Sequence, residues 1–108
     1  MKYIRKLYGK VTIKLDDFIN KYDEFKVEYY KIENYLAEPN SKKYGIEVLK
    51  IVEFENNQII ERKEIDNIFD NEEKIDKLLE LLKRNKVTPI SVEEIIADII
   101  CYNSQPIL

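Results

Sequence analysis

Residues 44–65 read YGIEVLKIVEFENNQIIERKEI, and this stretch decides which fold the chain can adopt. Its two arms, residues 44–54 and 58–65, are rich in isoleucine and valine, which favour strands. Between the arms lie Asn56 and Asn57, and asparagine tolerates the positive φ that a tight hairpin turn requires. The stretch therefore predicts an antiparallel β-hairpin.

One face of this hairpin is expected to be apolar. The side chains that alternate onto it are those of Ile46, Val48, Val52 and Phe54. Lys50 belongs to the same row, and a lysine within an apolar row indicates a local bulge in the strand.

Upstream of the hairpin, residues 3–15 alternate between the two sides, which predicts a half-buried strand. One side carries Leu7, Gly9, Val11, Ile13 and Leu15. The other side carries Lys6, Tyr8, Lys10, Thr12 and Lys14. We expect the first set to share the core face and the second to share the opposite face.

The next part of the chain has two interpretations. Residues 25–36 alternate aromatic and β-branched residues with charged ones, which favours a strand. An apolar stripe with helical spacing also runs over residues 18–36, so a long helix over 16–37 is the alternative. In the strand interpretation, residues 16–24 form a short helix or turn and residues 37–43 form a loop.

The last third of the chain predicts two amphipathic helices. The first is capped by Asp70, with Glu73 reaching back, and ends near Asn85. Its apolar face consists of Ile75, Leu78, Leu79 and Leu82. The second begins with a capping box formed by Ser91 and Glu94. Its apolar face consists of Val92, Ile95, Ile96, Ile99 and Ile100.

The linker between the helices contains Pro89, which cannot donate a backbone hydrogen bond and disfavours a helical conformation at the residue before it. We therefore expect the chain to run extended from Val87 to Ile90. Both of these end residues are expected to be buried against the sheet.

These elements predict one domain over residues 1–108, because a chain of 108 residues is long enough for a single core. The fold class is α+β: an antiparallel sheet of three to four strands, with two C-terminal amphipathic helices packed on one face.

No catalytic constellation is recognisable. The sequence has no histidine, which removes the commonest general base and metal ligand. Gly9 and Gly45 are too far apart for a phosphate-binding loop, and the single cysteine, Cys101, can form no intrachain disulfide. We expect Cys101 to pack as a small hydrophobic residue. We expect no catalytic, cofactor-binding or metal-binding residue, and the chain is not expected to be an enzyme.

The leading hypothesis is a non-catalytic protein–protein interaction or regulatory module, with a second copy of the chain as one candidate partner. The alternative is a nucleic-acid-binding module, because lysines interleaved with an aromatic residue on a strand can hold bases and phosphates. Its candidate residues are Lys6, Tyr8, Lys10 and Lys14. The formal charge of -3 disfavours it, since nucleic-acid binders are usually basic.

Three short segments have a familiar pattern: YGIEV at residues 44–48, NKVTPI at 85–90 and EIIAD at 94–98. Over residues 44–100 the chain resembles a family of small uncharacterised proteins from clostridia-like, low-GC Firmicutes. The resemblance implies a cytoplasmic bacterial protein and assigns no activity or site residue. The chain also has no apolar run near the roughly 20 residues that a membrane span needs, so no membrane association is expected.

Overall fold

The structure is a computed structural model that describes residues 2–14, 24–35 and 41–104 of the chain. Its elements, in order, are β1 (Lys2–Lys14), β2 (Glu24–Tyr35), β3 (Lys42–Phe54), β4 (Asn57–Phe69), α1 (Glu72–Arg84) and α2 (Pro89–Ser104). The predicted α+β class is confirmed. The strand interpretation of residues 25–36 is also confirmed, whereas the predictions for Leu15, for residues 16–23 and for most of the 37–43 loop lie outside the described residues.

The four strands form one sheet in the order β1-β2-β3-β4, and every neighbouring pair is antiparallel. The β3–β4 hairpin turns at Glu55 and Asn56, whose φ angles are 47° and 68°. Two consecutive positive φ angles are typical of the tight turn that matches the twist of the flanking strands. Asn57 already pairs with Phe54, so the turn comes one residue earlier than predicted.

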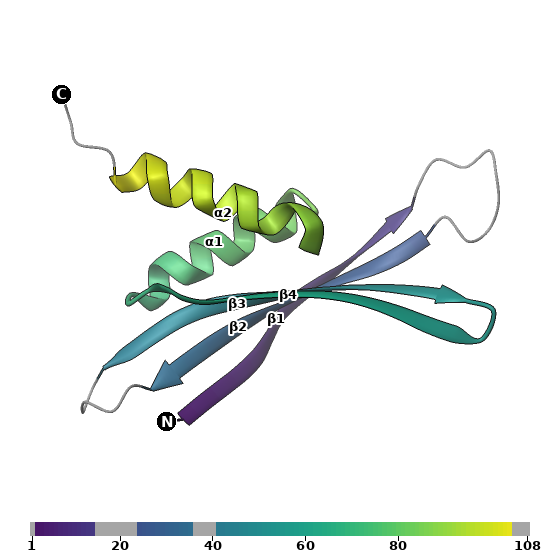
Figure 1. Cartoon of the computed structure of the whole chain (residues 1–108), viewed down its shortest axis with the longest axis horizontal. Helices are drawn as coiled ribbons and strands as arrows, with labels where there is room; N and C mark the ends of the chain where they lie inside the picture. The colour runs from purple at the N-terminus through teal and green to yellow at the C-terminus, as the bar shows by residue number, and fades with distance from the viewer. Residues whose placement is uncertain (1, 15–23, 36–40, 105–108) are drawn as a thin grey trace.

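Both helices pack on the same face of the sheet, which we call the helix side (Figure 1). The predicted apolar face of α1 is confirmed, since all four of its residues are buried. The sheet contributes Val27, Tyr29, Tyr44, Ile46 and Val48 to the same core. Lys31 of β2 ties α1 to the sheet, because its ammonium lies 2.8 Å from both Glu72 and Asp76.

The N-cap of α1 is Asn71 rather than the predicted Asp70. The Asn71 side chain accepts a hydrogen bond of 3.1 Å from the backbone N–H of Lys74. That bond satisfies one of the free donors in the first turn of the helix. The helix ends at Arg84, close to the predicted end, and Asn85 is its C-cap: the backbone N–H of Asn85 bonds to the carbonyl of Leu81.

The second helix begins earlier than predicted, at Pro89 itself. Proline suits the first position of a helix, because its φ is already helical and its missing N–H would have no partner there. As a result Ile90 lies on the outer side of the helix with 86% of its surface exposed, and the prediction that it is buried is wrong. Val87 is buried as predicted. Cys101, predicted to pack inside, is exposed.

Two irregularities interrupt the sheet, and neither is at Lys50, where a bulge was predicted. In β1, Leu7 pairs with Tyr30 and Gly9 with Tyr29, so Tyr8 is an extra residue without a paired partner. The extra residue shifts the alternation, and Leu7 faces away from the helices with 54% of its surface exposed.

The second irregularity lies opposite Gly45. Tyr44 pairs with Phe69 and Ile46 with Ile65, so one residue of β3 faces three residues of β4. Asn67, in the middle of those three, has a φ of 52°. A Cβ atom at Gly45 would lie 2.3 Å from the carbonyl oxygen of Ile65, so only glycine fits there.

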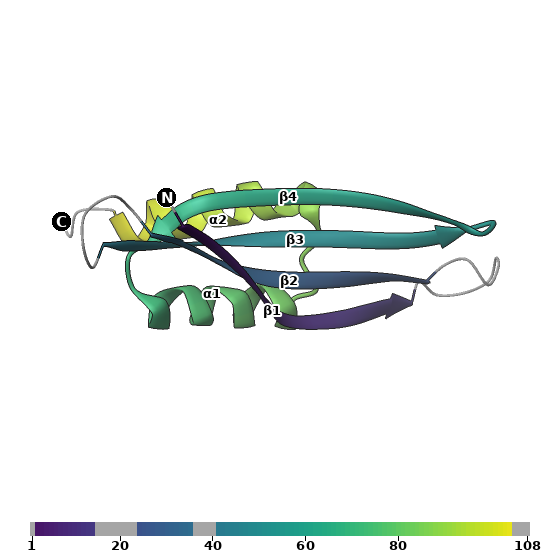
Figure 2. The same cartoon turned by 90° about the horizontal axis from the view of Figure 1, so that it is seen from below.

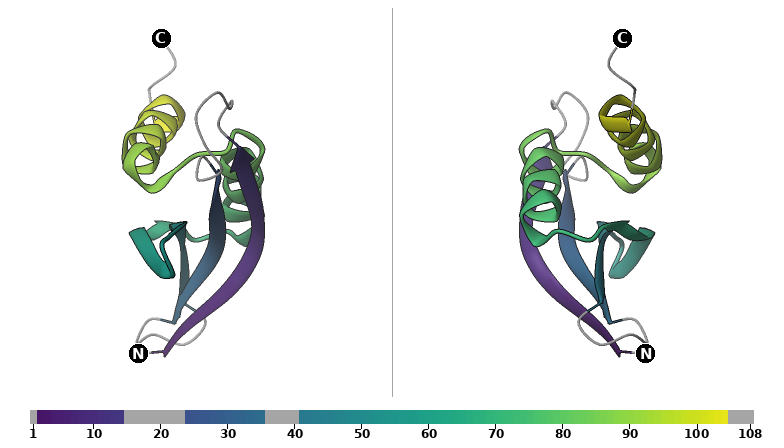
Figure 3. Two further views of the ribbon diagram at one scale, coloured as in Figure 1. Left: turned by 90° about the vertical axis from the view of Figure 1, so that its right-hand side faces the viewer. Right: turned by 90° about the vertical axis from the view of Figure 1, so that its left-hand side faces the viewer.

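The sheet is strongly coiled, and the first part of β1 crosses the face without helices, which we call the open side (Figures 2 and 3). The coiling brings the two edge strands together: the Tyr3 hydroxyl of β1 donates a hydrogen bond of 2.8 Å to Glu64 of β4. Ile32 and Leu49 are buried on this side although no helix covers them.

The strands extend well beyond both helices at one end of the molecule, as Figure 2 shows. The chain accordingly spreads over 51 × 39 × 17 Å. We call the uncovered end the distal part of the sheet; it comprises residues 11–14, 24–26, 50–54 and 57–61.

Candidate interaction site

The four residues predicted to form a nucleic-acid face do not share one face. The bulge at Tyr8 divides them: Lys6 and Tyr8 lie on the helix side, whereas Lys10 and Lys14 lie on the open side. The two residues on the helix side are engaged within the fold. The Lys6 ammonium lies 3.4 Å from Glu33, and the Tyr8 hydroxyl donates a 2.7 Å hydrogen bond to Glu80 of α1.

The contact between Tyr8 and Glu80 also affects the chemistry of the phenol. The hydrogen bond to the carboxylate, together with partial burial, raises the pKa of Tyr8. The ring packs against the core next to α1 and does not stand free on a basic strand. The alternation of β1 could not indicate this contact, because Glu80 lies 72 residues further along the chain.

A buried carboxylate, Glu47, occupies the open side of the sheet. It accepts a charged hydrogen bond from Arg5 of β1, and Arg62 of β4 lies 3.3 Å from its other oxygen. The Arg5 guanidinium also stacks on the Tyr30 ring, 3.5 Å from the centroid. The two oxygens of Glu47 thus contact basic side chains from two different strands, β1 and β4, and the cluster joins these strands across the open side of the coiled sheet.

The second buried carboxylate, Glu33, is engaged in a comparable way. Besides the contact with Lys6, it accepts a hydrogen bond of 3.4 Å from the Tyr35 hydroxyl. Nearby, the amides of Asn34 and Asn67 are joined by a 3.1 Å hydrogen bond, which ties β2 to the irregular part of β4. These polar groups therefore stabilise the coiled sheet.

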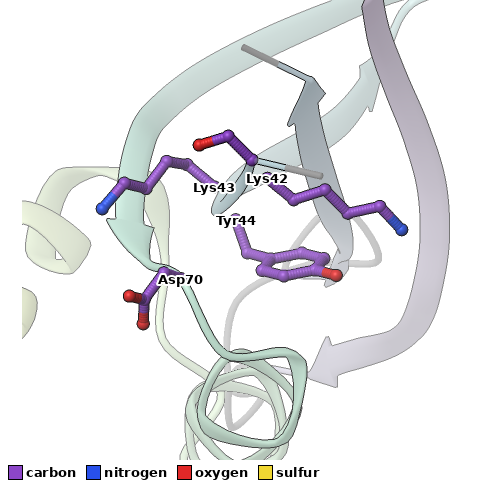
Figure 4. A pocket seen from close by; sticks show the side chains of 5 residues that line it. Lys42, Lys43, Tyr44 and Asp70 are labelled. Carbon is purple, nitrogen blue, oxygen red and sulfur yellow. The ribbon is translucent and has the colours of Figure 1, made fainter. Parts of the chain in front are cut away.

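An open pocket of about 420 Å³ lies where β3 begins, lined by Ser41, Lys42, Lys43, Tyr44 and Asp70. In Figure 4 the side chains of Lys42 and Lys43 extend in opposite directions. The Lys42 ammonium lies 4.9 Å from the centroid of the Tyr35 ring. The two lysines thus do not converge on a common point, as recognition of a small anion would require.

The distal part of the sheet carries an apolar row on its helix side. The register places Ile13 beside Phe25 and Val52 beside Ile59, and the pairing of Lys26 with Ile51 brings Phe25 in line with Val52. One row of apolar side chains therefore crosses all four strands beyond the helices. We call Ile13, Phe25, Val52 and Ile59 the distal row.

The distal row is only partly covered. Ile59 has 54% of its surface exposed, and the Lys50 ammonium lies over the Phe25 ring at 4.5 Å from its centroid. Sequence reasoning missed this row as a site, although it identified the apolar alternation. The signal is a length mismatch, because strands of 12 or 13 residues are much longer than helices of 13 and 16 residues can cover.

Neither α1 nor α2 has the length and apolar character needed to cross a membrane. Within residues 2–14, 24–35 and 41–104, no group of three acidic or cysteine side chains is placed to hold a metal ion.

The fold and the site together define a class of protein: a small α+β domain whose sheet is half covered by helices and carries an apolar row at its free end. A model of a family of unknown function, DUF6514, matches residues 10–102, and the chain belongs to this family. No curated protein and no solved structure matches the chain.

Proposed function

We propose that the protein is a non-catalytic interaction module that binds another polypeptide on the distal part of its sheet. The observation that carries this proposal is the distal row. It continues the apolar face of the sheet beyond the helices, where Ile13, Phe25 and Val52 are half-buried and Ile59 is exposed. Exposed apolar surface that is continuous across several strands is typical of interaction sites.

Two further observations support a binding role over a catalytic one. The buried carboxylates Glu33 and Glu47 are held by basic side chains, and such engaged groups are poor general acids or bases. The sequence also has no histidine. We place the protein in the cytoplasm of a low-GC Firmicute, which agrees with the resemblance of residues 44–100 and with the single cysteine.

Photo-cross-linking within cells tests this proposal. A benzophenone amino acid replaces Phe25 in the distal row, and in a matched variant it replaces Lys26, the adjacent residue on the open side. We expect covalent polypeptide adducts at position 25 and few or none at position 26. Equal yields at the two positions, or no adduct at position 25, would contradict the proposal. Mass spectrometry of the adducts then separates self-association from binding of a different protein.

A further inference from the structure

The two edges of the sheet differ in how well they can accept another strand. β1 contains the bulge at Tyr8 and carries several cations, including Lys6, Lys10 and Lys14. Bulges and lysines are devices that protect an edge strand from pairing. β4 pairs regularly with β3 over residues 57–65, contains no proline, and is irregular only beyond Ile65. β4 is therefore the edge that can be extended.

The sequence of β4 is complementary to itself in one register. When two copies run antiparallel with Arg62 opposite Arg62, Glu61 faces Lys63 of the second copy. On the same helix side, Ile59 then faces Ile65 of the second copy. Directly opposed residues of antiparallel strands lie within contact distance, so each dimer would gain two opposite-charge pairs and two apolar pairs.

Neighbouring registers lack this complementarity. Centring the pair on Glu61 places two carboxylates opposite each other, and centring it on Lys63 places two ammonium groups together. Like charges directly opposite are unfavourable in a sheet. In the register centred on Arg62, the two guanidinium groups meet on the open side, where each is 3.3 Å from the carboxylate of its own Glu47.

The same symmetry also places new neighbours beside the distal part of each copy. A two-fold axis through Arg62, perpendicular to the sheet, reverses the strand direction, so the helices of one copy lie beside the distal part of the other. α2 lies beside β4 (Figure 2), and Glu93 of α2 is 2.8 Å from Lys63 of β4. Ile59, half exposed in the single chain, would then border Ile65 and the helical layer of the second copy.

We propose that a second copy of this chain pairs with it through β4, in the antiparallel register centred on Arg62. This inference goes beyond the proposed function, because β3 separates Phe25 of β2 from the β4 edge and pairing there leaves Phe25 accessible to another polypeptide. The product is a two-fold dimer with one continuous sheet, and a closed symmetry of this kind leaves only the bulged, basic β1 strands at its edges.

A charge-exchange experiment tests the register. Glu61→Lys alone opposes lysine to lysine, and Lys63→Glu alone opposes glutamate to glutamate, so each variant should dimerise at least about tenfold more weakly than the natural chain. An equimolar mixture of the two variants restores both opposite-charge pairs and should dimerise like the natural chain. Sedimentation equilibrium measures the dissociation constants, and circular dichroism checks that each variant is folded, since Lys63→Glu also loses its contact with Glu93.

Disulfide trapping provides a second measurement in a Cys101→Ser background. Arg62→Cys places two cysteines on the two-fold axis at a Cα separation of roughly 4.5–5.5 Å, which suits a disulfide. Ile60→Cys, on the same side of the strand, is the matched control and should not cross-link. Three results would each overturn the inference. The first is a natural chain that stays monomeric at millimolar concentration, and the second is a mixture that fails to restore dimers. The third is cross-linking of Ile60→Cys instead of Arg62→Cys. Adducts to a different protein at position 25, with a monomeric chain, would overturn the dimer and leave the proposed function standing.

Discussion

Gly45 lies in β3 at the point where the backbone of β4 comes closest to it. Three residues of β4 bulge over this single glycine, and a Cβ atom there would meet the Ile65 carbonyl oxygen at 2.3 Å and the Asp66 Cα atom at 2.8 Å. Both neighbours are backbone atoms, which cannot move without disturbing the pairing of the strands. The absent side chain is thus a requirement of the fold.

We predict that Gly45→Ala destabilises the protein by about 2 kcal/mol or more, because the added methyl group overpacks a buried backbone contact. Gly9→Ala is the matched control, since its Cβ would meet only the flexible side chain of Lys83, at 3.1 Å. Urea denaturation measures both free energies of unfolding. Equal costs at the two glycines would show that the contact with Ile65 is not the cause.

Tyr29 is fully buried, and its hydroxyl donates a 2.8 Å hydrogen bond to the carbonyl of Val87 in the linker between the helices. Burial raises the pKa of this phenol to about 12, from its usual value of 10. The folded protein therefore holds the phenol proton more tightly than the unfolded chain does. Its contribution to stability is complete below pH 10 and is lost as the pH rises toward 12.

We predict that Tyr29→Phe lowers the free energy of unfolding at neutral pH by roughly 1 kcal/mol, because the Val87 carbonyl loses its donor. In the natural chain, a pKa shift of this size lowers the free energy of unfolding by up to roughly 2–3 kcal/mol at alkaline pH. The variant should lack this part of the decrease. Denaturation curves between pH 9 and about 11 provide the comparison. If the unfolding free energies of the natural chain and of Tyr29→Phe fall in parallel with pH, the raised pKa of Tyr29 is not the cause of the decrease.

At the scale of single elements, the linker between the helices shows which apolar residue fixes their arrangement. Val87 is buried, whereas Ile90 lies on the outside of the first turn of α2. We predict that Val87→Ala costs about 1–3 kcal/mol through lost burial and a residual cavity. Ile90→Ala should change the free energy of unfolding by less than about 0.5 kcal/mol. Thermal or urea unfolding of the two variants settles the order, and a larger loss at position 90 would contradict the observed start of α2.

The start of α1 permits a similar comparison. Asn71→Ala should cost about 1 kcal/mol, because the backbone N–H of Lys74 loses its cap. Asp70→Ala should cost clearly less, since Asp70 lies one residue before the cap and is exposed. Measured unfolding free energies in the opposite order would show that the cap lies at Asp70, as the sequence pattern alone indicated.

The same elements show what the sequence could and could not predict. Period-two alternation identified the strands, and helical spacing identified the buried residues of α1, because both patterns depend on local geometry. The bulges at Tyr8 and opposite Gly45 were missed. At each bulge the chain contacts another element, since Tyr8 bonds to Glu80 of α1 and Gly45 lies against the backbone of Ile65 in β4. The pattern of a single strand does not contain such contacts. For the same reason, the alternation in β1 wrongly grouped Tyr8 with Lys10.

At the scale of the whole molecule, the coiling of the sheet had no sequence signal either. Pairs such as Tyr3 with Glu64, or Arg5 with Glu47, join strands that are not neighbours in the sheet. Ordinary alternation makes such residues look like solvent-facing charges. The candidate site was therefore only half predictable: apolar alternation was visible, but the distal row emerges only once the helices are seen to end short of the strands.

Outside the distal part, the sheet is covered on both sides. The helices cover one side, and the first part of β1 covers the other, where Arg5 and Arg62 contact Glu47. The distal part is covered less completely, since Ile13, Phe25 and Val52 are half-buried there and Ile59 is exposed. β2 passes through both parts and pairs with a strand on each side over nearly its whole length. From Lys26 to Tyr35, β2 is paired with both neighbouring strands, whereas Phe25 is paired with β1 alone. Differences in amide protection from Lys26 onward would therefore reflect side-chain packing.

We predict a gradient of hydrogen exchange along β2. Amides near Tyr29 and Ile32, whose side chains are fully buried, should exchange only through global unfolding. Amides of Phe25 and Lys26 should exchange at least about tenfold faster, through local opening of the distal end. Because β2 is a central strand, pairing of two copies through β4 would leave this gradient in place. Hydrogen exchange followed by nuclear magnetic resonance measures both groups in one sample, and uniform protection from residue 25 to residue 32 would show that the distal end is as firmly packed as the covered core.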